Sequence, residues 1–359
     1  MFPMSKRRSI LTSTVAIVGL NDNDAQALGQ GIQHIGGIDG LNTSERSVVV
    51  KVGVFSHRAD NHTSVGLVRA IVNSFDRAPN VFLVESDNYQ GNGLERLQIW
   101  KETYTEKVIP VNLSGELNTR RVTLAGQEMN LSNLLFTPNV LVSTHILRRF
   151  ERGSILKNLF GCIPSPKKTK YHKILPVLLA DLYEAIGGID LAVLDGTFFW
   201  RGAGDIPIRM NTLLVGRDAV AVEAVGGVLA GLKLEKMPVL QEFAGRGLGE
   251  GDLKNIEIVG ASLETLKPKF RLASKQHAKR WREISGAPKM WAPAIDGLIQ
   301  EGFFRLPNKR TREDVRKALK AKSVPVEGNM NLVVTTLKRR VKKGKLKSKK
   351  GPEGWIYWT

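Results

Sequence analysis

The 359-residue chain contains a single cysteine, Cys162. One cysteine excludes a disulfide framework within the chain. It also excludes a zinc site or iron–sulfur cluster built only from cysteines, so no iron–sulfur cluster is expected. No stretch of eighteen consecutive apolar residues occurs, and the sequence therefore predicts no transmembrane helix and no membrane partner. A lone thiol fits a reducing compartment, and we expect the protein in the cytoplasm.

The common motifs of nucleotide binding and hydrolysis are missing as well. Gly19 follows the first predicted strand, but no G-x-G-x-x-G pattern accompanies it. The sequence contains no Walker loop, no zincin motif and no nucleophile elbow. These absences leave the reaction and the cofactor unassigned, and no residue is assigned to a metal.

Acidic residues are scarce in the last quarter of the chain. Residues 274–359 hold 22 Lys and Arg against seven Asp and Glu, a formal excess of +15 within the +19 of the whole chain. The first 273 residues therefore carry only +4. Such asymmetry predicts a polyanionic partner for the C-terminal part.

The N-terminus has two interpretations. Lys6-Arg7-Arg8 followed by apolar residues resembles a short signal peptide, even a twin-arginine one. Because Thr12, Ser13 and Thr14 interrupt the apolar stretch, we favour a basic start followed by a buried first strand.

The length favours two domains, and 42% apolar residues favour a globular chain. We predict an α/β domain over residues 1–270, a basic transition segment over 271–287 and a winged-helix-like domain over 288–359. In the first part, short β-branched runs without polar alternation predict a layered, mostly parallel sheet with helices on both faces. The predicted strands are Thr14–Val18, Ser47–Val52, Val81–Val84, Val140–Val142, Ile189–Leu194 and Asn211–Val215. The predicted helices lie near Ser64–Phe75, His172–Ile186 and Ala219–Leu229.

The C-terminal part reads as three helices and a hairpin, a small α+β arrangement. Helices are predicted near Pro293–Glu301, after the capping-box pattern that begins at Thr311, and near Asn329–Lys343. The hairpin pairs Lys345–Lys349 with Trp355–Trp358. The sequence contains no heptad pattern, so it does not predict an oligomeric state.

The third of these helices has an apolar face and a polar, basic face. A helix that enters a major groove needs such a division, so we expect nucleic acid as the partner. A protein or RNA-assembly surface and a simply solvated charged face are the alternatives. The candidate nucleic-acid-binding residues are Asn331, Thr335, Lys338, Arg339, Lys342, Lys347, Lys349 and Lys350.

In open α/β sheets, ligands bind beyond the carboxyl ends of the strands. Three predicted strands end at His145, Asp195 and Glu85–Asp87. The densest group of reactive side chains spans His145 to His172, where a turning backbone with several Lys and Arg residues suits a small anionic ligand. A basic surface loop is the alternative. The candidate ligand-binding residues are His145, Lys157, Asn158, Gly161, Lys167, Lys168, His172, Asp195, Gly202 and Gly204.

Several of these residues allow more than one role. His145 and His172 suit acid–base chemistry or a metal, or they bond a loop. Asp195 orients a ligand or caps a turn. Cys162 would need a nearby base to act as a nucleophile.

The same segment resembles a known family. Lys157–Gly161, preceded by Thr144-His145 and followed by Lys167-Lys168 and Tyr171-His172, resembles the central motif of the family catalogued as domain of unknown function 362. Over about residues 13–265 the resemblance continues, and Gly202 and Gly204 resemble its glycine-rich segment. It departs from the family where Ser143 replaces a lysine, where Val52-Gly53 replaces Pro-Asn and where Glu223 replaces an aspartate.

The resemblance implies the α/β scaffold and its ligand cleft. Many members carry a segment with four-cysteine clusters, which this chain lacks. Two functions are therefore expected. The first is a nucleic-acid-binding protein whose α/β domain senses an anionic ligand. The alternative is an enzyme or redox-accessory protein without its own cluster, in which the winged helix is an adaptor for another protein.

Overall fold

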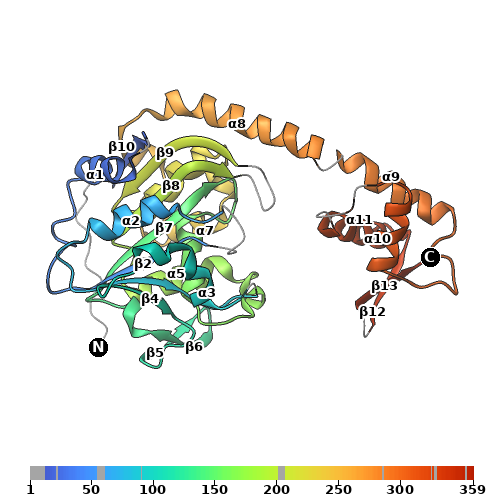
Figure 1. The fold of residues 1–359 in the computed structure, drawn as a ribbon, viewed down its shortest axis with the longest axis horizontal. Coiled ribbons are helices and arrows are strands. Elements are labelled where there is room, and N and C mark those ends of the chain that lie inside the picture. The colour runs from blue at the N-terminus through green and yellow to red at the C-terminus, as the bar shows by residue number, and fades with distance from the viewer. Residues whose placement is uncertain are drawn as a thin grey trace. The chain divides into compact units, whose positions relative to one another are not determined.

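The computed structural model describes residues 13–21, 23–54, 61–89, 91–200, 207–284, 287–324, 326, 330–351 and 354–359. The side chains of residues 277–284, 287–290 and 330–332 lie outside this description. The chain divides into two compact units, Met1–Lys275 and Gln276–Thr359 (Figure 1). Among the described residues, no helix is both long enough and apolar enough to cross a membrane.

The described part of the first unit contains one eight-stranded sheet with the order β10-β1-β9-β8-β7-β2-β3-β4. Strand β9 runs antiparallel to both of its neighbours, β1 and β8, and the other adjacent pairs are parallel. The strands are β1 (Ser13–Gly19), β2 (Val48–Lys51), β3 (Val81–Glu85), β4 (Val108–Asn112), β7 (Val140–Arg148), β8 (Leu191–Trp200), β9 (Ile208–Gly216) and β10 (Ile256–Gly260). The mostly parallel α/β fold is confirmed.

Helices cover both faces of this sheet, which explains the unbroken apolar runs. Val48 and Val50 pack in one buried cluster, whereas Val49 between them packs in the other. The first cluster includes side chains of α1 (Asp24–His34), α2 (Val65–Asn73) and α3 (Gly93–Leu97). The second includes α4 (Ile155–Asn158), α5 (Leu175–Ile186), α6 (Ala219–Leu229), α7 (Pro238–Gly245) and the start of α8 (Leu263–Ile284). A strand buried on both faces has no position where a polar residue is favoured.

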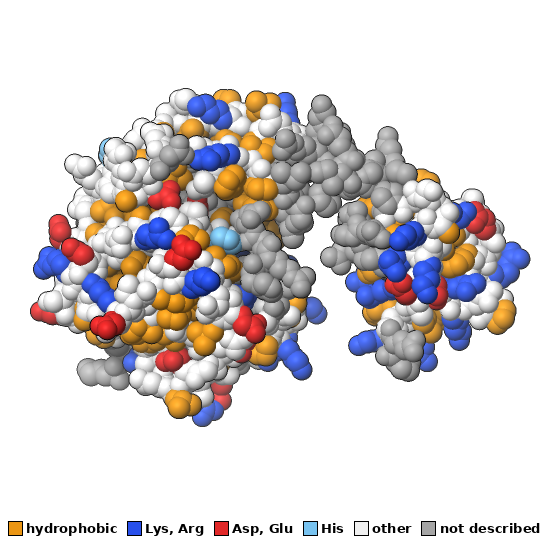
Figure 2. Space-filling view, viewed as in Figure 1, with side chains coloured by type: hydrophobic (Ala, Val, Ile, Leu, Met, Phe, Trp, Pro, Cys, Tyr) orange, Lys and Arg blue, Asp and Glu red, His pale blue; other side chains and the backbone are white. Residues whose placement is uncertain are grey.

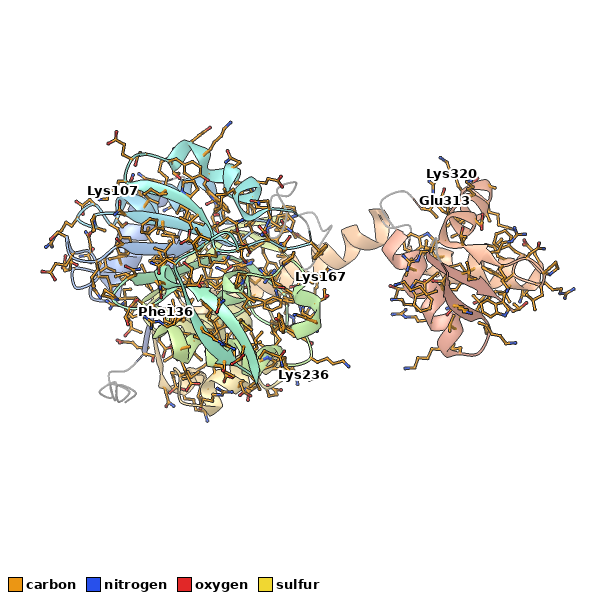
Figure 3. All side chains as sticks on the ribbon, turned by 90° about the horizontal axis from the view of Figure 1, so that it is seen from below. Lys107, Phe136, Lys167, Lys236, Glu313 and Lys320 are labelled. Carbon is orange, nitrogen blue, oxygen red and sulfur yellow. The ribbon has the colours of Figure 1, made fainter. Side chains whose placement is uncertain are left out.

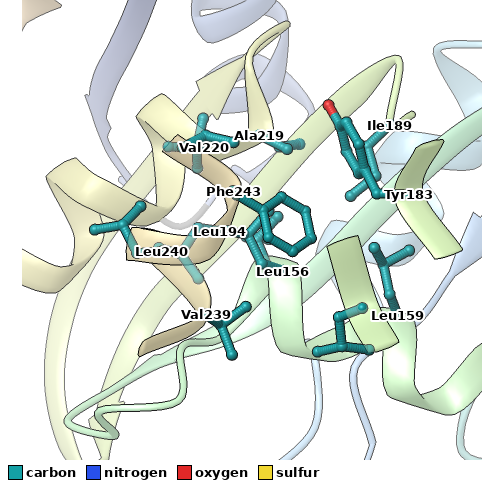
Figure 4. Close-up of a cluster of buried hydrophobic side chains, with 14 of the residues drawn as sticks. Leu156, Leu159, Tyr183, Ile189, Leu194, Ala219, Val220, Val239, Leu240 and Phe243 are labelled. Carbon is teal, nitrogen blue, oxygen red and sulfur yellow. The ribbon is translucent and has the colours of Figure 1, made fainter. Parts of the chain in front are cut away.

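Aromatic rings fill the second cluster at its centre. Tyr183 of α5 and Phe243 of α7 meet edge to face, with ring centroids 5.2 Å apart, and Val220 of α6 packs in the same cluster (Figure 4). Leu156 and Leu159 pack in the same cluster (Figure 4). The short segment that carries Lys157 is therefore anchored by the apolar neighbours on either side of it.

Two strands extend beyond their predicted ends. Strand β7 continues past His145 to Arg148, and β8 continues past Asp195 to Trp200. Polar residues and Gly196 suggested an end, but β8 and β9 pair antiparallel beyond that point, with an irregularity between Gly196 and Phe198. The helix predicted from His172 begins at Leu175 instead, because a 3-10 turn, η4 (Lys168–Tyr171), precedes it.

The segment predicted as a transition over residues 271–287 is helical for most of its length. Helix α8 (Leu263–Ile284) runs through it, and after Pro268 its sequence contains no proline or glycine that would end a helix. Basic charge does not indicate a linker here, because Lys and Arg are good helix formers.

The second unit contains α9 (Ala287–Gln300), α10 (Arg312–Ala321) and α11 (Met330–Lys342). A three-stranded sheet joins them, with β13 (Gly354–Trp358) between β11 (Arg310–Thr311) and β12 (Lys347–Gly351). The three helices and the hairpin are confirmed, as is the capping box of α10, in which Thr311 and Asp314 bond each other's backbone N–H. Helix α9 begins before the predicted start at Pro293 and contains this proline in its interior, although proline is unfavourable there and usually marks the start of a helix.

Candidate functional site

The carboxyl ends of three adjacent parallel strands place buried polar groups side by side. Lys51 is the last residue of β2 and Glu85 is the last residue of β3, while Lys51 is also paired in register with Ser143 of β7. Ligands of open α/β sheets bind at this edge.

A buried ion cluster lies at this edge. Lys51 Nζ lies 2.6 Å from Glu85 Oε1, and Arg96 Nη2 lies 3.1 Å from Glu85 Oε2. The three side chains are almost completely buried. Burial alone would raise the pKa of the Glu85 carboxyl, but Lys51 and Arg96 outweigh it and hold that pKa below its usual value. Glu85 is therefore a carboxylate at neutral pH.

Asn158 joins this cluster to the neighbouring backbone. Its Oδ1 accepts a hydrogen bond from Lys51 Nζ at 3.1 Å, and its Nδ2 donates to the carbonyl oxygens of Lys51 at 2.8 Å and Thr144 at 3.0 Å. These bonds tie α4 to β2 and β7. Most of the hydrogen bonds that this side chain can make are used inside the protein, so its chief role is to position the segment.

Gly161 lies where a side chain has no room. A Cβ atom there would lie 2.3 Å from Lys51 Cε and 2.4 Å from Glu85 Oε1. The glycine in the family-like motif is thus required by the buried ion pair against which it packs.

Lys168 also lies near the ion cluster. Its Nζ donates to Ser86 Oγ at 2.6 Å, and Ser86 Oγ donates to the Ile163 carbonyl at 3.0 Å. Burial lowers the pKa of Lys168 to about 8, against the opposing effect of Glu85. Its neighbour Lys167 is exposed and does not line the cavity described below (Figure 3).

A cavity of about 400 Å³ opens above this cluster. Four of its lining side chains are cationic, and among the described residues no Asp or Glu lines it. The cations are Arg148, Arg152, Lys157 and Lys168. The other lining residues are Val54, Asn88, Tyr89, His145, Phe150, Asn158, Phe160, Gly161, Pro166, Thr169 and His172. Four cations that converge on one space repel one another, and an anion in that space would relieve the repulsion.

Lys157 shows this repulsion most clearly. Its Nζ lies 5.7 Å from the centroid of the Phe150 ring and 5.6 Å from that of Phe160. Burial and, to a smaller extent, the charges of Arg148 and Arg152 together lower the pKa of Lys157 to about 7. The amine is therefore about half protonated at neutral pH, where an ordinary lysine is fully charged.

A buried carboxylate holds the segment that carries Lys157. Glu223 of α6 accepts hydrogen bonds from the backbone N–H of Ser154 at 2.8 Å and of Leu156 at 2.9 Å. Arg148 Nη2 donates to the Gly153 carbonyl at 3.2 Å, and its Nε has no hydrogen-bond partner. Burial raises the pKa of Glu223 against these bonds. Glu223, which replaces the aspartate of the family pattern, therefore positions the segment that carries Lys157.

The two candidate histidines face the same cavity but do different things. His145 is buried, and its Nδ1 lies 3.3 Å from the Ile146 carbonyl oxygen. Burial, together with Arg148 and Lys157, lowers the pKa of His145 well below 6.5, so the ring is neutral at neutral pH. His172 is exposed at the cavity wall, with its ring centroid 5.7 Å from that of Phe160. Among the described residues, no cluster of three or more His, Cys, Asp or Glu could hold a metal ion.

Asp195 does not line the cavity. Its Oδ2 accepts from the backbone N–H of Ser64, the N-cap of α2, at 2.7 Å, and its Oδ1 accepts from the N–H and hydroxyl of Thr197. It therefore caps backbone groups. Cys162 is buried, and burial raises the pKa of its thiol to about 12, which makes it a poor nucleophile. Gly202 and Gly204 lie outside the described residues.

The candidate set from sequence lacked several residues of this site. Lys51, Glu85 and Arg96 form the buried cluster, and Arg148 and Arg152 line the cavity. One signal was present: Lys51 stands in an apolar, β-branched run, and a lysine buried in a central strand must be paired. Glu85 ends the next predicted strand and is the nearest acid to expect.

In the second unit, the predicted basic residues lie at the surface. Thr335, Lys338, Arg339 and Lys342 of α11 are exposed, whereas Val333 and Leu337 of the same helix are buried. Lys347, Lys349 and Lys350 of β12 are exposed as well. Figure 2 shows Lys and Arg side chains spread over the visible face of this unit. The side chain of Asn331 lies outside the described residues.

Arg340 differs from its neighbours on α11. Its guanidinium pairs with the Asp296 carboxylate of α9, with Nε–Oδ1 and Nη2–Oδ2 distances of 3.0 and 2.5 Å. Lys338, Arg339 and Lys342 make no ion pair with a described residue. The helix thus uses one cation to hold α9 and leaves three accessible to a partner.

The fold and the cavity define an α/β protein with a cationic pocket at the carboxyl edge of a mostly parallel sheet. The chain belongs to the family described as Domain of unknown function (DUF362), whose profile matches residues 48–227. The matched span contains Lys51, Glu85, Lys157, Lys168 and Glu223, so both the ion cluster and the cavity fall within it. None of the curated proteins matches this chain.

Proposed function

We propose that this protein binds a small anionic ligand in its α/β unit and nucleic acid through its C-terminal unit, and that the first event regulates the second. The observation that carries the proposal is the cavity lined by Arg148, Arg152, Lys157 and Lys168 without a described carboxylate. The site is concave and of the size that small-molecule sites usually have, roughly 300–1,000 Å³.

The protonation of Lys157 supports an anion as the natural occupant. Without a counter-charge, burial and like charges keep its pKa at about 7. An anion within a few ångströms favours the protonated form and raises that pKa again. Binding an anion therefore draws a proton onto Lys157, and the charge that results holds the anion more strongly.

The C-terminal unit supports the nucleic-acid part. Three helices followed by a two-stranded hairpin fit a winged helix, with α11 as the recognition helix and β12–β13 as the wing. A major groove about 12 Å wide admits a helix. The exposed Lys338, Arg339 and Lys342 of α11 and the lysines of β12 suit phosphate contacts. The proposed regulation of nucleic-acid binding by the ligand is supported by the presence of both units in one chain.

Duplex DNA and the full chain test the nucleic-acid part. Binding measured across a salt series should weaken by about 0.9 log units per log unit of salt for each phosphate neutralised. Replacing Lys338 and Arg339 by Ala should reduce that slope by roughly two units and weaken binding. The matched control replaces Lys101 and Lys236, exposed lysines of the first unit, and should change neither. No binding at low salt would remove the nucleic-acid part.

A second experiment tests the regulation. The affinity for DNA is measured with and without inorganic phosphate at constant ionic strength, first for the native chain and then for Lys157→Met. A phosphate effect that disappears in Lys157→Met supports sensing through the cavity. Equal affinities with and without phosphate in the native chain would contradict it.

A second function is favoured by Lys157 itself. An amine with a pKa of about 7 inside a cavity suits a general base, because it exists in both protonation states near neutral pH. In that case the protein is an enzyme and its C-terminal unit contacts another protein. Turnover would then survive the Lys338 and Arg339 replacements, and the DNA salt series would show no binding.

A further inference from the structure

The cavity has aromatic walls as well as cations. Phe150, Phe160 and His172 line the same space as Arg148 and Lys157. Arg148 Cζ lies 5.0 Å from the centroid of the Phe150 ring, and Lys157 Nζ lies 5.6 and 5.7 Å from the centroids of Phe160 and Phe150. A site that only bound a small hydrated anion would have no use for these rings.

The volume of the cavity favours a ligand that is larger than a single anionic group. A dry cavity of roughly 150 Å³ holds one benzene molecule. The 400 Å³ here leaves room for a ring together with an acid group. A lone phosphate would fill a small part of this volume and would leave the apolar walls of Phe160 and Val54 in contact with water.

The geometry of the rings favours a planar aromatic body. The Phe160 and His172 rings lie 5.7 Å apart with an interplanar angle of 38°. Aromatic pairs prefer centroid separations of about 4.5–7 Å in offset or tilted arrangements. A ligand ring placed beside Phe160 extends this arrangement, and such a contact adds up to roughly tenfold in affinity beyond buried area.

The number of cations favours a phosphate over a carboxylate. Two arginines and two lysines line the cavity, and a guanidinium bonds a phosphate through two parallel N–H groups. Arg148 Nε is buried and has no hydrogen-bond partner, so it has a donor to offer. A phosphate monoester carries about −1.5 to −2 charges at neutral pH, against −1 for a carboxylate.

We propose that the ligand is an aromatic phosphate, with its ring packed against Phe160 and His172 and its phosphate held by Arg148, Arg152 and Lys157. This proposal rests on the proposed function, in which the cavity binds an anion. It adds the chemical class of that anion.

Three phosphates of graded size test the proposal by calorimetry on the full chain. They are phenyl phosphate, methyl phosphate and inorganic phosphate. Phenyl phosphate should bind about tenfold or more tightly than methyl phosphate. Replacing Phe160 by Leu should bring the two affinities close together and leave methyl phosphate almost unchanged.

Because Phe160 is buried, a second variant protects the test against misfolding. Phe150 is 37% exposed, so Phe150→Leu should preserve the fold and still reduce the preference for phenyl phosphate several-fold. The matched control is Phe136→Leu. Phe136, which is labelled in Figure 3, is buried in the same unit. It packs under Arg120 and does not line the cavity. This variant should keep the preference.

The outcomes separate the two proposals. Equal affinity of the native chain for phenyl and methyl phosphate would overturn the aromatic ligand and leave the anion site standing. Failure to bind any of the three phosphates would overturn both. A preference for phenyl phosphate that survives both Phe160→Leu and Phe150→Leu would place the binding elsewhere and also overturn this proposal.

Discussion

Lys51 and Glu85 form a 2.6 Å ion pair across the carboxyl ends of two adjacent parallel strands, and both side chains are almost completely buried. Such a pair is costly to desolvate, and removing one partner leaves an uncompensated charge in the interior. Here Glu85 also pairs with Arg96, so one carboxylate serves two cations. The base of the cavity is therefore held by a single acidic residue.

Replacing Glu85 by Gln should destabilise the fold strongly. Lys51 and Arg96 would lose their counter-charge, and breaking a buried pair typically costs about 3–5 kcal/mol. Denaturant unfolding of the full chain, followed in the α/β unit, measures the change. Glu128→Gln is the control, because Glu128 pairs with Arg121 at the exposed surface, and it should cost less than about 1 kcal/mol. Equal effects of the two variants would contradict the ion cluster.

The depressed pKa of Lys157 predicts how stability depends on pH. The unfolded lysine has a pKa of about 10.4 and the folded one of about 7. Between these values the unfolded state binds more protons, so this residue makes the free energy of unfolding rise with pH across that window. Below about pH 7 the lysine is protonated in both states, and the buried charge lowers the free energy of unfolding by its full amount. The difference between native chain and Lys157→Met, measured by unfolding at several pH values, should shrink toward high pH. A difference between the two proteins that does not change with pH would contradict the lowered pKa of Lys157.

Gly161→Ala should disrupt the site. The new Cβ would lie 2.3 Å from Lys51 Cε and 2.4 Å from Glu85 Oε1, atoms that are fixed by the buried pair. Overpacking of this kind typically costs about 1–3 kcal/mol. Gly29→Ala is the matched control. Gly29 lies within α1 with nothing inside 4 Å of the added methyl, so this change should stabilise by about 0.5–1 kcal/mol. Thermal unfolding of both variants gives the comparison, and a neutral Gly161→Ala would contradict the close packing.

The sequence allowed much of the α/β fold to be predicted, because strands such as Val48–Lys51 are buried on both faces and contain almost only apolar residues. Strand β4 and the hairpin of β5 (Thr119–Leu124) and β6 (Gln127–Ser132) were not predicted. All three strands are partly exposed. Strand β4 contains Pro110, and β5 and β6 mix charged and polar with apolar residues, so no periodic pattern marks them.

The candidate site was predicted in part. The segment around Lys157 was found because its reactive residues are close together in the sequence. Arg96 is not predicted, and Glu85 is predicted only as the end of a strand, because their pairing with Lys51 arises from contacts between elements far apart in the chain. For Asp195 the sequence leaves two roles open, ligand binding and capping, and its carboxylate accepts from the backbone N–H of Ser64, as the capping role requires.

The most direct test of the account is proton uptake when an anion binds. Phenyl phosphate is titrated into the full chain at about pH 8, where its second pKa of about 6 leaves it fully charged. The titration is repeated in two buffers with different ionisation enthalpies. Lys157 is mostly neutral at this pH, so binding should take up close to one proton, with a further share from Lys168, and the measured heat should differ between the buffers. Lys157→Met should lose most of that difference. Equal heats in both buffers for the native chain, or no binding, would contradict the claim that an anion occupies the cavity beside Lys157.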